Sequence, residues 1–407
     1  MKQPLIRLAG LLLAFAFVGA LVIVGAPCGA RADDAPAQFN VYGFAHLDYI
    51  QDFNRVNPDW ASTLRPSRIP TTDGLYGSDG QAVLSARQSR LGAQATLPTD
   101  NGSVFAKFEF DMFGVGADEG LTTIRLRHAY GQWNAWLAGQ TNTLFMDVDL
   151  FPNTIDYWGP AGMVFLRNPQ IRYTKNMEDN SFAIAIEHPS GDIDVGQVRD
   201  IDPNLGSNIV ATSKVPDATA QFRINKPWGH VQVAGIARRI GYETLGTSGN
   251  SPHGSEFGGG GDFSLIFNTA SKKDKIMLGA VVGVGIANYM NDGGTDLAPD
   301  GTVAAPTAKA VPLQGYTAYI DHTWNPKFSS SVGYSRTQVD NTTLQDSDAF
   351  KSGDYASVNL IVYPTKNVFF GIEGLYGRRT DNGGAEGEDR RVQVSGHYSF
   401  SSLDFAK

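Results

Sequence analysis

Apolar and polar residues alternate along most of this chain, with the period of two that is typical of β-strands. The clearest segment is SVFAKFEFDMF, residues 103–113, in which Val104, Phe108 and Phe110 share one face. Lys107 and Glu109 occupy the opposite face. One face suits hydrocarbon and the other suits water, so the pattern predicts a strand in the wall of a transmembrane β-barrel.

Strands of this kind recur along the whole chain. The first is predicted over residues 38–52 and the second over residues 83–97, where a change of parity near Gln88 predicts a β-bulge. We expect sixteen strands, joined by seven short turns and eight long loops, one of the loops over residues 380–389. Short turns at one end and long loops at the other are typical of outer-membrane barrels. The predicted fold class is all-β: a transmembrane antiparallel β-barrel of about 16 strands with long extracellular loops.

Residues 121–174 contain the strand and the loop around which we expect the barrel interior to be organised. Parity places four residues of LTTIRLRHAYGQW on the lumen face, namely Thr123, Arg125, Arg127 and Ala129, and it places Ile124, Leu126, His128 and Tyr130 toward lipid. The later stretch TLFMDVDLFPNTIDYWGPAGMVFLRNP is too long and too aromatic for a hairpin connection. We expect this third loop to fold into the lumen and to set three acids across from the wall arginines: Asp147, Asp149 and Asp156.

Cations on the lumen face are the candidate pore-lining residues. By parity they are Arg90, Lys107, Arg125, Arg127, Arg172 and Arg223, and Arg167 at the end of the third loop joins them. A ladder of cations in a narrow lumen attracts anions. The alternative is that these side chains are ordinary filling, paired with the lumen acids Asp48, Glu109, Asp111, Glu187 and Asp321. Of these seven residues, Arg125 and Arg127 are the ones for which a role in attracting anions is most favoured.

Composition and charge narrow the functional classes. The chain has 407 residues and a formal net charge of -8, which becomes -11 once Lys2, Arg7 and Arg31 are removed with the N-terminal segment. Nucleic acid is not an expected partner, because phosphate binding needs a basic surface. No run of 18 apolar residues follows the N-terminal segment, which excludes helical membrane spans.

No catalytic motif is present. The sequence contains neither G-x-S-x-G nor H-E-x-x-H, its seven histidines lie apart, and its one cysteine is Cys28. We therefore predict no enzyme, no cofactor and no metal site. One alternative is an outer-membrane lipid hydrolase in which His128 is catalytic. The favoured interpretation is that His128 lies at the membrane interface without a catalytic role. A calcium-binding loop over residues 292–300 is another alternative, but it lacks the bidentate Glu of an EF-hand, and a solvated loop is favoured.

The N-terminal segment has the features of a secretory signal peptide. Residues 1–32 begin with Lys2 and Arg7, continue through an apolar run, and close with the small-x-small pattern Ala30-Arg31-Ala32. The alternative is a retained membrane anchor, since the apolar run approaches the length of a membrane-spanning helix. We predict a signal peptide over residues 1–32 and a single barrel domain over residues 33–407.

Several long motifs resemble the DcaP-like family of trimeric outer-membrane porins. They are NVYGFAHLDYI, SARQSRLG, FEFDMFG, IRLRHAYGQW, LAGQTNTLFMDVDLFPNTIDYWGP and FLRNPQIRYT. The resemblance implies a homotrimer in the outer membrane of a Gram-negative cell, surrounded by its lipid, with an inward third loop. It also implies a passive channel for small hydrophilic solutes that favours anions such as dicarboxylates. The alternatives are a substrate-specific binding channel and, from another class, an outer-membrane enzyme or a structural barrel.

Some members of that family carry a helical coiled-coil extension before the barrel. In this chain only about six residues separate the predicted cleavage site from the first strand. A trimer would then be held together by the barrel walls alone.

The mature protein is expected to begin at Asp33, because Ala30 and Ala32 are the small residues that a signal peptidase reads. Intact-mass measurement of the protein extracted from outer membranes checks this position. A mature chain that retains any residue before Asp33 would contradict it.

Overall fold

The computed structural model describes residues 36–114 and 123–405. The predicted signal peptide, residues 1–32, lies outside the described residues. Over the described ranges, no helix combines the length and the hydrophobicity that a membrane-crossing helix needs.

The described residues form twenty strands and a few short helices. The strands of the first half are β1 (Gln38–Asp52), β2 (Gln81–Ser85), β3 (Arg90–Thr99), β4 (Gly102–Asp111), β5 (Arg125–Trp133), β6 (Trp136–Asn142), β7 (Arg167–Met177), β8 (Asn180–Glu187), β9 (Ile209–Thr212) and β10 (Asp217–Lys226). Those of the second half are β11 (Gly229–Thr244), β12 (Gly254–Asn268), β13 (Asp274–Val284), β14 (Leu297–Thr302), β15 (Ala305–Ala310), β16 (Pro312–Asn325), β17 (Phe328–Val339), β18 (Phe350–Thr365), β19 (Val368–Asp381) and β20 (Glu386–Ser401). Helices α2 (Val198–Ile201) and α3 (Pro203–Asn208) lie between β8 and β9.

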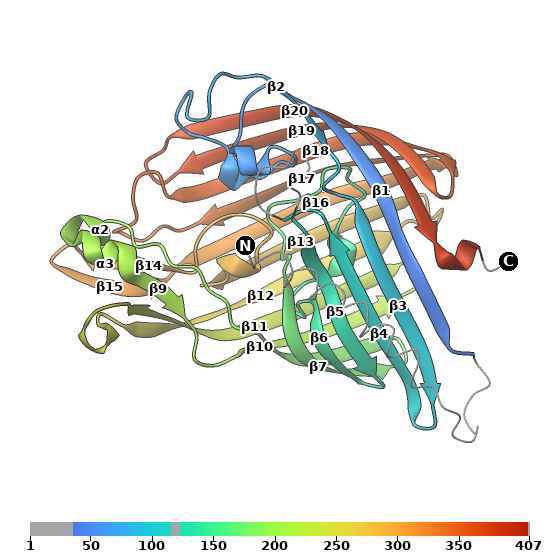
Figure 1. Cartoon of the computed structure of the whole chain (residues 1–407), viewed down its shortest axis with the longest axis horizontal. Coiled ribbons are helices and arrows are strands. Elements are labelled where there is room, and N and C mark those ends of the chain that lie inside the picture. The colour runs from blue at the N-terminus through green and yellow to red at the C-terminus, as the bar shows by residue number, and fades with distance from the viewer. Residues whose placement is uncertain (1–35, 115–122, 406–407) are drawn as a thin grey trace, which may run out of the picture.

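Eighteen of these strands form one antiparallel sheet, which closes because β1 pairs with β20 (Figure 1). Two wall strands are each interrupted once. β2 and β3 both pair with β1, and β9 and β10 both pair with β11. Eighteen strands less these two interruptions give sixteen wall strands over the described residues. The predicted fold class and the predicted irregularity near Gln88 are therefore confirmed.

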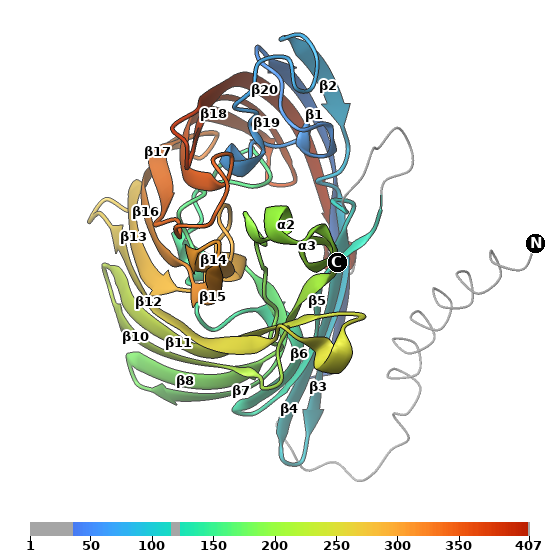
Figure 2. The ribbon, with the colours of Figure 1, turned by 90° about the vertical axis from the view of Figure 1, so that its left-hand side faces the viewer.

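Short turns and long loops lie at opposite ends of the barrel. All seven predicted short turns are confirmed, and Figure 2 looks into the other end, where α2, α3 and the β14–β15 hairpin cover part of the mouth. The predicted long loop over residues 380–389 is wrong. β19 ends at Asp381 and β20 begins at Glu386, because these polar residues continue the strand ladder and Arg378 pairs with Glu386.

A bulge in β5 changes which of its side chains face the lumen. The register between β4 and β5 shifts by one residue after Glu109, so Glu109 pairs with His128, Phe110 pairs with Leu126, and Arg127 is the extra residue. Arg127 and His128 consequently both point inward. The prediction that His128 and Tyr130 face lipid is wrong, because one extra residue reverses the parity of every residue beyond it.

Three loops fill one side of the barrel interior with an apolar core. We call residues 53–80 the first loop, residues 143–166 the third loop and residues 285–311 the sixth loop. Their buried residues include Leu64, Phe145 and Tyr289, which belong to one cluster with wall residues of β11, β12 and β13. The third loop thus folds inward, and polar space is left on the side of β3 to β7.

Hydrogen bonds to buried carboxylates hold the third loop in place. Asp156 accepts bonds from the Thr63 hydroxyl at 2.8 Å and from the Tyr355 hydroxyl at 3.1 Å. Glu373 of β19 accepts the backbone N–H groups of Ile155 at 2.9 Å and Asp156 at 2.8 Å. Asp156 therefore joins the third loop to the first loop and the wall. The expectation that it lies across from wall arginines 125 and 127 is wrong.

The substitution Asp156→Asn is expected to loosen the third loop. The amide replaces an acceptor oxygen by a donor, and each buried group left unpaired costs about 1–3 kcal/mol. Single-channel recordings should show larger and noisier currents, and the barrel should unfold at a lower temperature on heated gels. Asp59→Asn is the matched control, since Asp59 is exposed in the first loop. Quiet currents of normal size from Asp156→Asn would contradict the expectation.

Candidate functional site

Four lumen cations on neighbouring strands surround two buried carboxylates: Arg90, Lys107, Arg125 and Arg127 around Glu109 and Asp111. Arg127 is the most tightly held, at 2.8 Å from both Glu109 and Asp111. Four cations against two acids leave an excess of two positive charges. The structure therefore brings four predicted residues together, and it supports both interpretations, because the cations are paired and still outnumber their partners.

Arg125 and Arg127 differ in what they can offer to a solute. The Arg127 side chain is 9% exposed, and the Tyr157 hydroxyl of the third loop lies 3.1 Å from it. The Arg125 side chain is 28% exposed and has one carboxylate partner among the described residues, Asp111, at 3.1 Å. Tyr157 stacks on Phe113 with ring centroids 3.8 Å apart. Arg127 thus mainly joins wall to loop, whereas Arg125 faces the open space.

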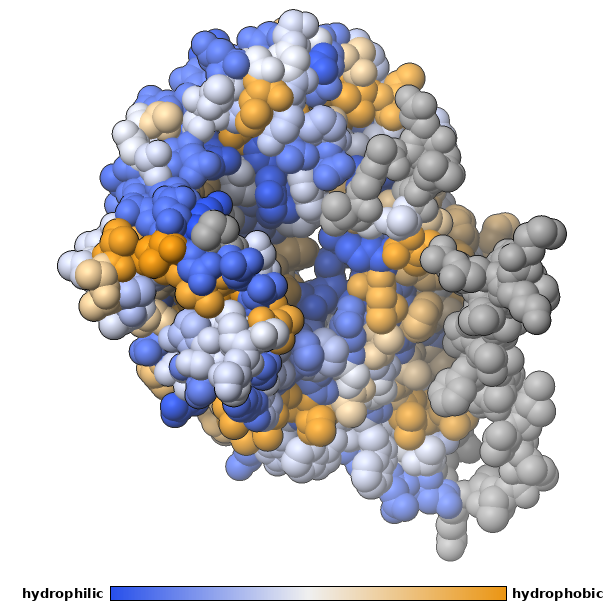
Figure 3. All heavy atoms as spheres, turned by 60° about the vertical axis from the view of Figure 1, so that its left-hand side comes forward, coloured by the Kyte–Doolittle hydropathy of each residue, from blue (hydrophilic) through white to orange (hydrophobic). Residues whose placement is uncertain are grey.

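That space is a cavity of about 560 Å³ between the first, third and sixth loops and the ends of β5, β6 and β7. Its charged lining residues are Arg65, Arg68, Arg125, Arg167 and Arg379 and the acids Asp192 and Asp292. Figure 3 shows the molecule hollowed in its middle, with hydrophilic atoms around the opening. Five arginines against two acids give the lining of this cavity an excess of positive charge.

The arginines of the cavity are not equally free to bind a solute. Arg65 donates to Asp292 at 2.8 and 3.0 Å, and its guanidinium lies 4.2 Å from the ring centres of both Trp60 and Trp158. Arg379 is paired with Asp381. Arg167 has no carboxylate partner among the described residues and its buried Nε makes no hydrogen bond, although its guanidinium lies over the Phe165 ring at 4.7 Å. Arg68 is exposed and likewise has no carboxylate partner among the described residues. Arg167 and Arg68 are therefore the cations of the cavity that are most available to an anion.

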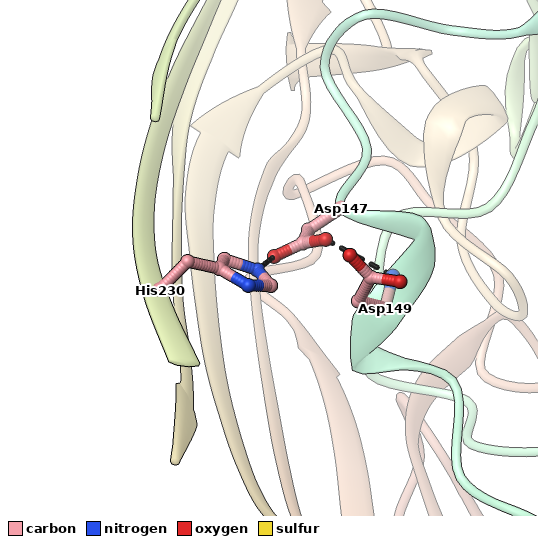
Figure 4. A group of neighbouring side chains, drawn as sticks. All are labelled: Asp147, Asp149 and His230. Atoms are coloured by element: carbon pink, nitrogen blue, oxygen red, sulfur yellow. Dashed lines mark hydrogen bonds and ion pairs between the residues drawn. The ribbon is translucent and has the colours of Figure 1, made fainter. Parts of the chain in front are cut away.

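Two of the predicted loop acids lie on another side of the lumen (Figure 4). Asp147 lies 2.7 Å from His230 Nε2, and Asp149 pairs with Arg223 of β10 at 2.5 Å. Burial acts to raise the pKa of Asp147, but hydrogen bonds from His230 and Ser264 outweigh it and lower that pKa. The loop acids therefore face Arg223 and not Arg125 or Arg127. The predicted field between those two arginines and the acidic loop does not form.

This acidic cluster has a second property that bears on metal binding. Ligand atoms of Asp147, Asp149 and His230 all lie within 4.8 Å of one another. The Arg223 guanidinium already lies 2.5 Å from Asp149 and 3.6 Å from Asp147, so it supplies the positive charge that a metal ion would bring. The cluster therefore joins the third loop to the barrel wall through Arg223 and His230.

The remaining sequence candidate, Arg172, stands apart from the cavity. It donates to the Gln170 side chain at 2.9 Å and to the backbone oxygen of Asn142 at 2.6 Å, which ties it to the wall. Parity analysis misses Arg65, Arg68 and Arg379. The first two lie in a loop, and the third directly precedes the segment predicted as a loop. The one sequence signal for Arg65 and Arg68 is the basic stretch LRPSR, residues 64–68.

The fold and the internal third loop define the class of the protein, that of outer-membrane β-barrels with the porin architecture. The structure resembles the anion-selective porin of Comamonas acidovorans with a TM-score of 0.52 and 10% identity, over 90% of this chain and 100% of that chain. It also resembles OmpF of Salmonella typhi, solved in complex with daunomycin, with a TM-score of 0.52 and 10% identity, over 89% of this chain and 97% of that chain. Identities this low establish the fold alone.

The particular family follows from the sequence. The sequence profile of the DcaP outer membrane protein family matches residues 29–241, more than half of the chain, and the protein therefore belongs to that family. The outer membrane channel DcaP of Acinetobacter baumannii has a similar structure, with a TM-score of 0.75 and 22% identity over 92% of this chain and 100% of that chain. No curated protein matches the sequence significantly. The predicted resemblance is confirmed, and the protein is an outer-membrane channel and not an enzyme.

The substitution Arg127→Gln is expected to destabilise the barrel far more than Arg125→Gln. Removing Arg127 leaves two buried carboxylates short of a partner, which costs on the order of 3 kcal/mol. The temperature at which the purified channel unfolds on heated gels should fall for Arg127→Gln and change little for Arg125→Gln. Equal unfolding temperatures for the two variants would show that Arg127 does not hold wall and loop together.

Proposed function

We propose that the channel favours small anions and that dicarboxylates gain most from its cavity. The proposal rests on the observation that Arg167 has no carboxylate partner among the described residues. It lies in a cavity lined by five arginines and two acids. Guanidinium groups bind carboxylates through two parallel hydrogen bonds, which few other side chains can do. A dicarboxylate engages two arginines of the cavity at once, whereas a monocarboxylate engages one.

The cations of β3, β4 and β5 extend the attraction beyond the cavity. An anion that leaves Arg167 meets Arg125, which is partly exposed, and then the excess charge around Glu109 and Asp111. Charges of one sign in a narrow, low-dielectric passage raise the local concentration of the opposite ion. Transport is passive under this proposal, because the anion moves down its own gradient between weak sites.

The cellular setting belongs to the same proposal. The leader, residues 1–32, is removed, and the barrel assembles in the outer membrane as a homotrimer whose subunits meet through their walls. Tight and saturable binding of one solute class is a second candidate, favoured by the aromatic residues Trp158 and Phe165 that line the cavity beside the arginines. Current block that saturates with solute concentration would distinguish this binding channel from a general one.

The substitution Arg167→Gln is expected to lower the anion-over-cation permeability ratio roughly two- to fivefold, since one charge a few ångströms away is worth about 0.5–1 kcal/mol in water. The zero-current potential across a potassium chloride gradient measures the ratio. Arg172→Gln is the matched control, because Arg172 lies on the same strand and is bonded to the wall.

Succinate tests the finer part of the proposal. It should reduce the chloride current of the wild-type channel, and Arg167→Gln should weaken that effect. If the zero-current potential and the succinate effect are the same in Arg167→Gln and in the wild type, the cavity does not determine selectivity.

A further inference from the structure

A second group of cations lies outside the lumen, on the outward face of β17, β18 and β19 at the loop end. The outward-facing residues of β17 follow a fixed order toward that end, from Val332 through Tyr334 to Arg336. On β19 the order is the same, from Ile372 through Tyr376 to Arg378. Tyrosines of membrane barrels lie at the level where hydrocarbon meets headgroups. The arginines lie two residues beyond them, about 7 Å along the strand, and so at the level of the headgroups.

A pocket of about 220 Å³ opens at this level. Its lining residues are Arg336, Gln338, Lys351, Ser352, Arg378, Thr380 and Glu386. Strand register confirms that the pocket faces outward, because Arg336 pairs with Asp354 and Ser352 with Gln338, on the face opposite to the buried Thr337. The pocket therefore lies on the wall that contacts lipid and is separate from the conducting lumen.

The chemistry of the pocket suits a phosphate group. Arg336 and Arg378 are each paired with one acid, Asp354 and Glu386, whereas Lys351 has no acidic partner among the described residues. The pocket therefore keeps a positive excess. Its other donors, the hydroxyls of Ser352 and Thr380 and the amide of Gln338, make no side-chain hydrogen bond to the described residues. Phosphate monoesters carry close to two negative charges and three acceptor oxygens, which match these donors.

We propose that this pocket binds a phosphate of the phosphorylated glycolipid, lipopolysaccharide, that forms the outer leaflet of the outer membrane. The short turns and the described chain ends lie at the other end of the barrel, so the pocket is at the extracellular side. Below it, Val332, Val358 and Ile372 are 51%, 56% and 49% exposed and provide a surface for acyl chains. A lipid bound by its phosphate would thus extend its chains along an apolar strip that continues directly from the pocket.

Retention of lipid A by the purified full-length channel tests the proposal. Native mass spectrometry should show that the wild type retains bisphosphorylated lipid A and that Lys351→Glu retains it at least tenfold more weakly. Lys351→Arg should bind as the wild type does. The matched control is Lys327→Glu, because Lys327 lies at the opposite rim beside β17 and undergoes the same change of charge. Lipid A from which both phosphates have been removed should bind weakly to every variant.

Three results would overturn the proposal. Equal retention of lipid A by the wild type and by Lys351→Glu would exclude a role for the pocket. Displacement of lipid A by millimolar inorganic phosphate would indicate a site for a free anion. A changed number of subunits in Lys351→Glu would indicate that the face is covered by a second copy of the chain. The zero-current potential should be the same in Lys351→Glu and the wild type, so this test is independent of solute selectivity.

Discussion

The closed barrel is required because the hydrocarbon of a membrane offers the protein backbone no hydrogen-bonding partners. Every backbone N–H and C=O of a sheet that spans the membrane must therefore pair with a neighbouring strand. β1 and β20 satisfy this requirement by pairing from Tyr42 to Asp52, which removes the free edges of the sheet. Sixteen wall strands enclose an interior too wide for wall side chains alone to fill. The loops consequently become part of the interior, and they decide where a solute can pass.

Two kinds of interaction place those loops. Apolar residues such as Phe145 and Leu64 belong to one cluster with wall residues from β11 to β19 and close one side of the lumen. Buried carboxylates fix the orientation of the third loop, because Glu373 accepts the backbone N–H groups of Ile155 and Asp156. The open side is then lined by β3 to β7, where the cations are. Packing and polar anchoring together turn a wide barrel into a narrow passage with one charged wall.

Arginine serves two purposes in this wall, and burial separates them. Arg127 is almost fully buried between two carboxylates, so its charge is used to hold strands and loop together. Arg167 and Arg125 are partly exposed, and they leave positive charge available in the cavity. On the outer wall the difference is one of pairing, because Arg336 and Arg378 have acidic partners and Lys351 has none among the described residues. Counting cations therefore says less about binding than finding those whose charge is not already neutralised.

The sequence by itself determined the barrel, its sixteen strands and the inward position of Arg90, Lys107 and Arg125, because the side of a strand on which a residue lies is a local property. It could not locate the bulge that turns His128 inward, since a bulge exists only relative to the paired strand. Nor could it place Arg65 and Arg167 in one cavity, because they lie far apart in the chain and meet only when the loops pack inside the barrel. Only the tertiary structure decided which arginines have carboxylate partners, because pairing depends on distances between segments that no local pattern encodes.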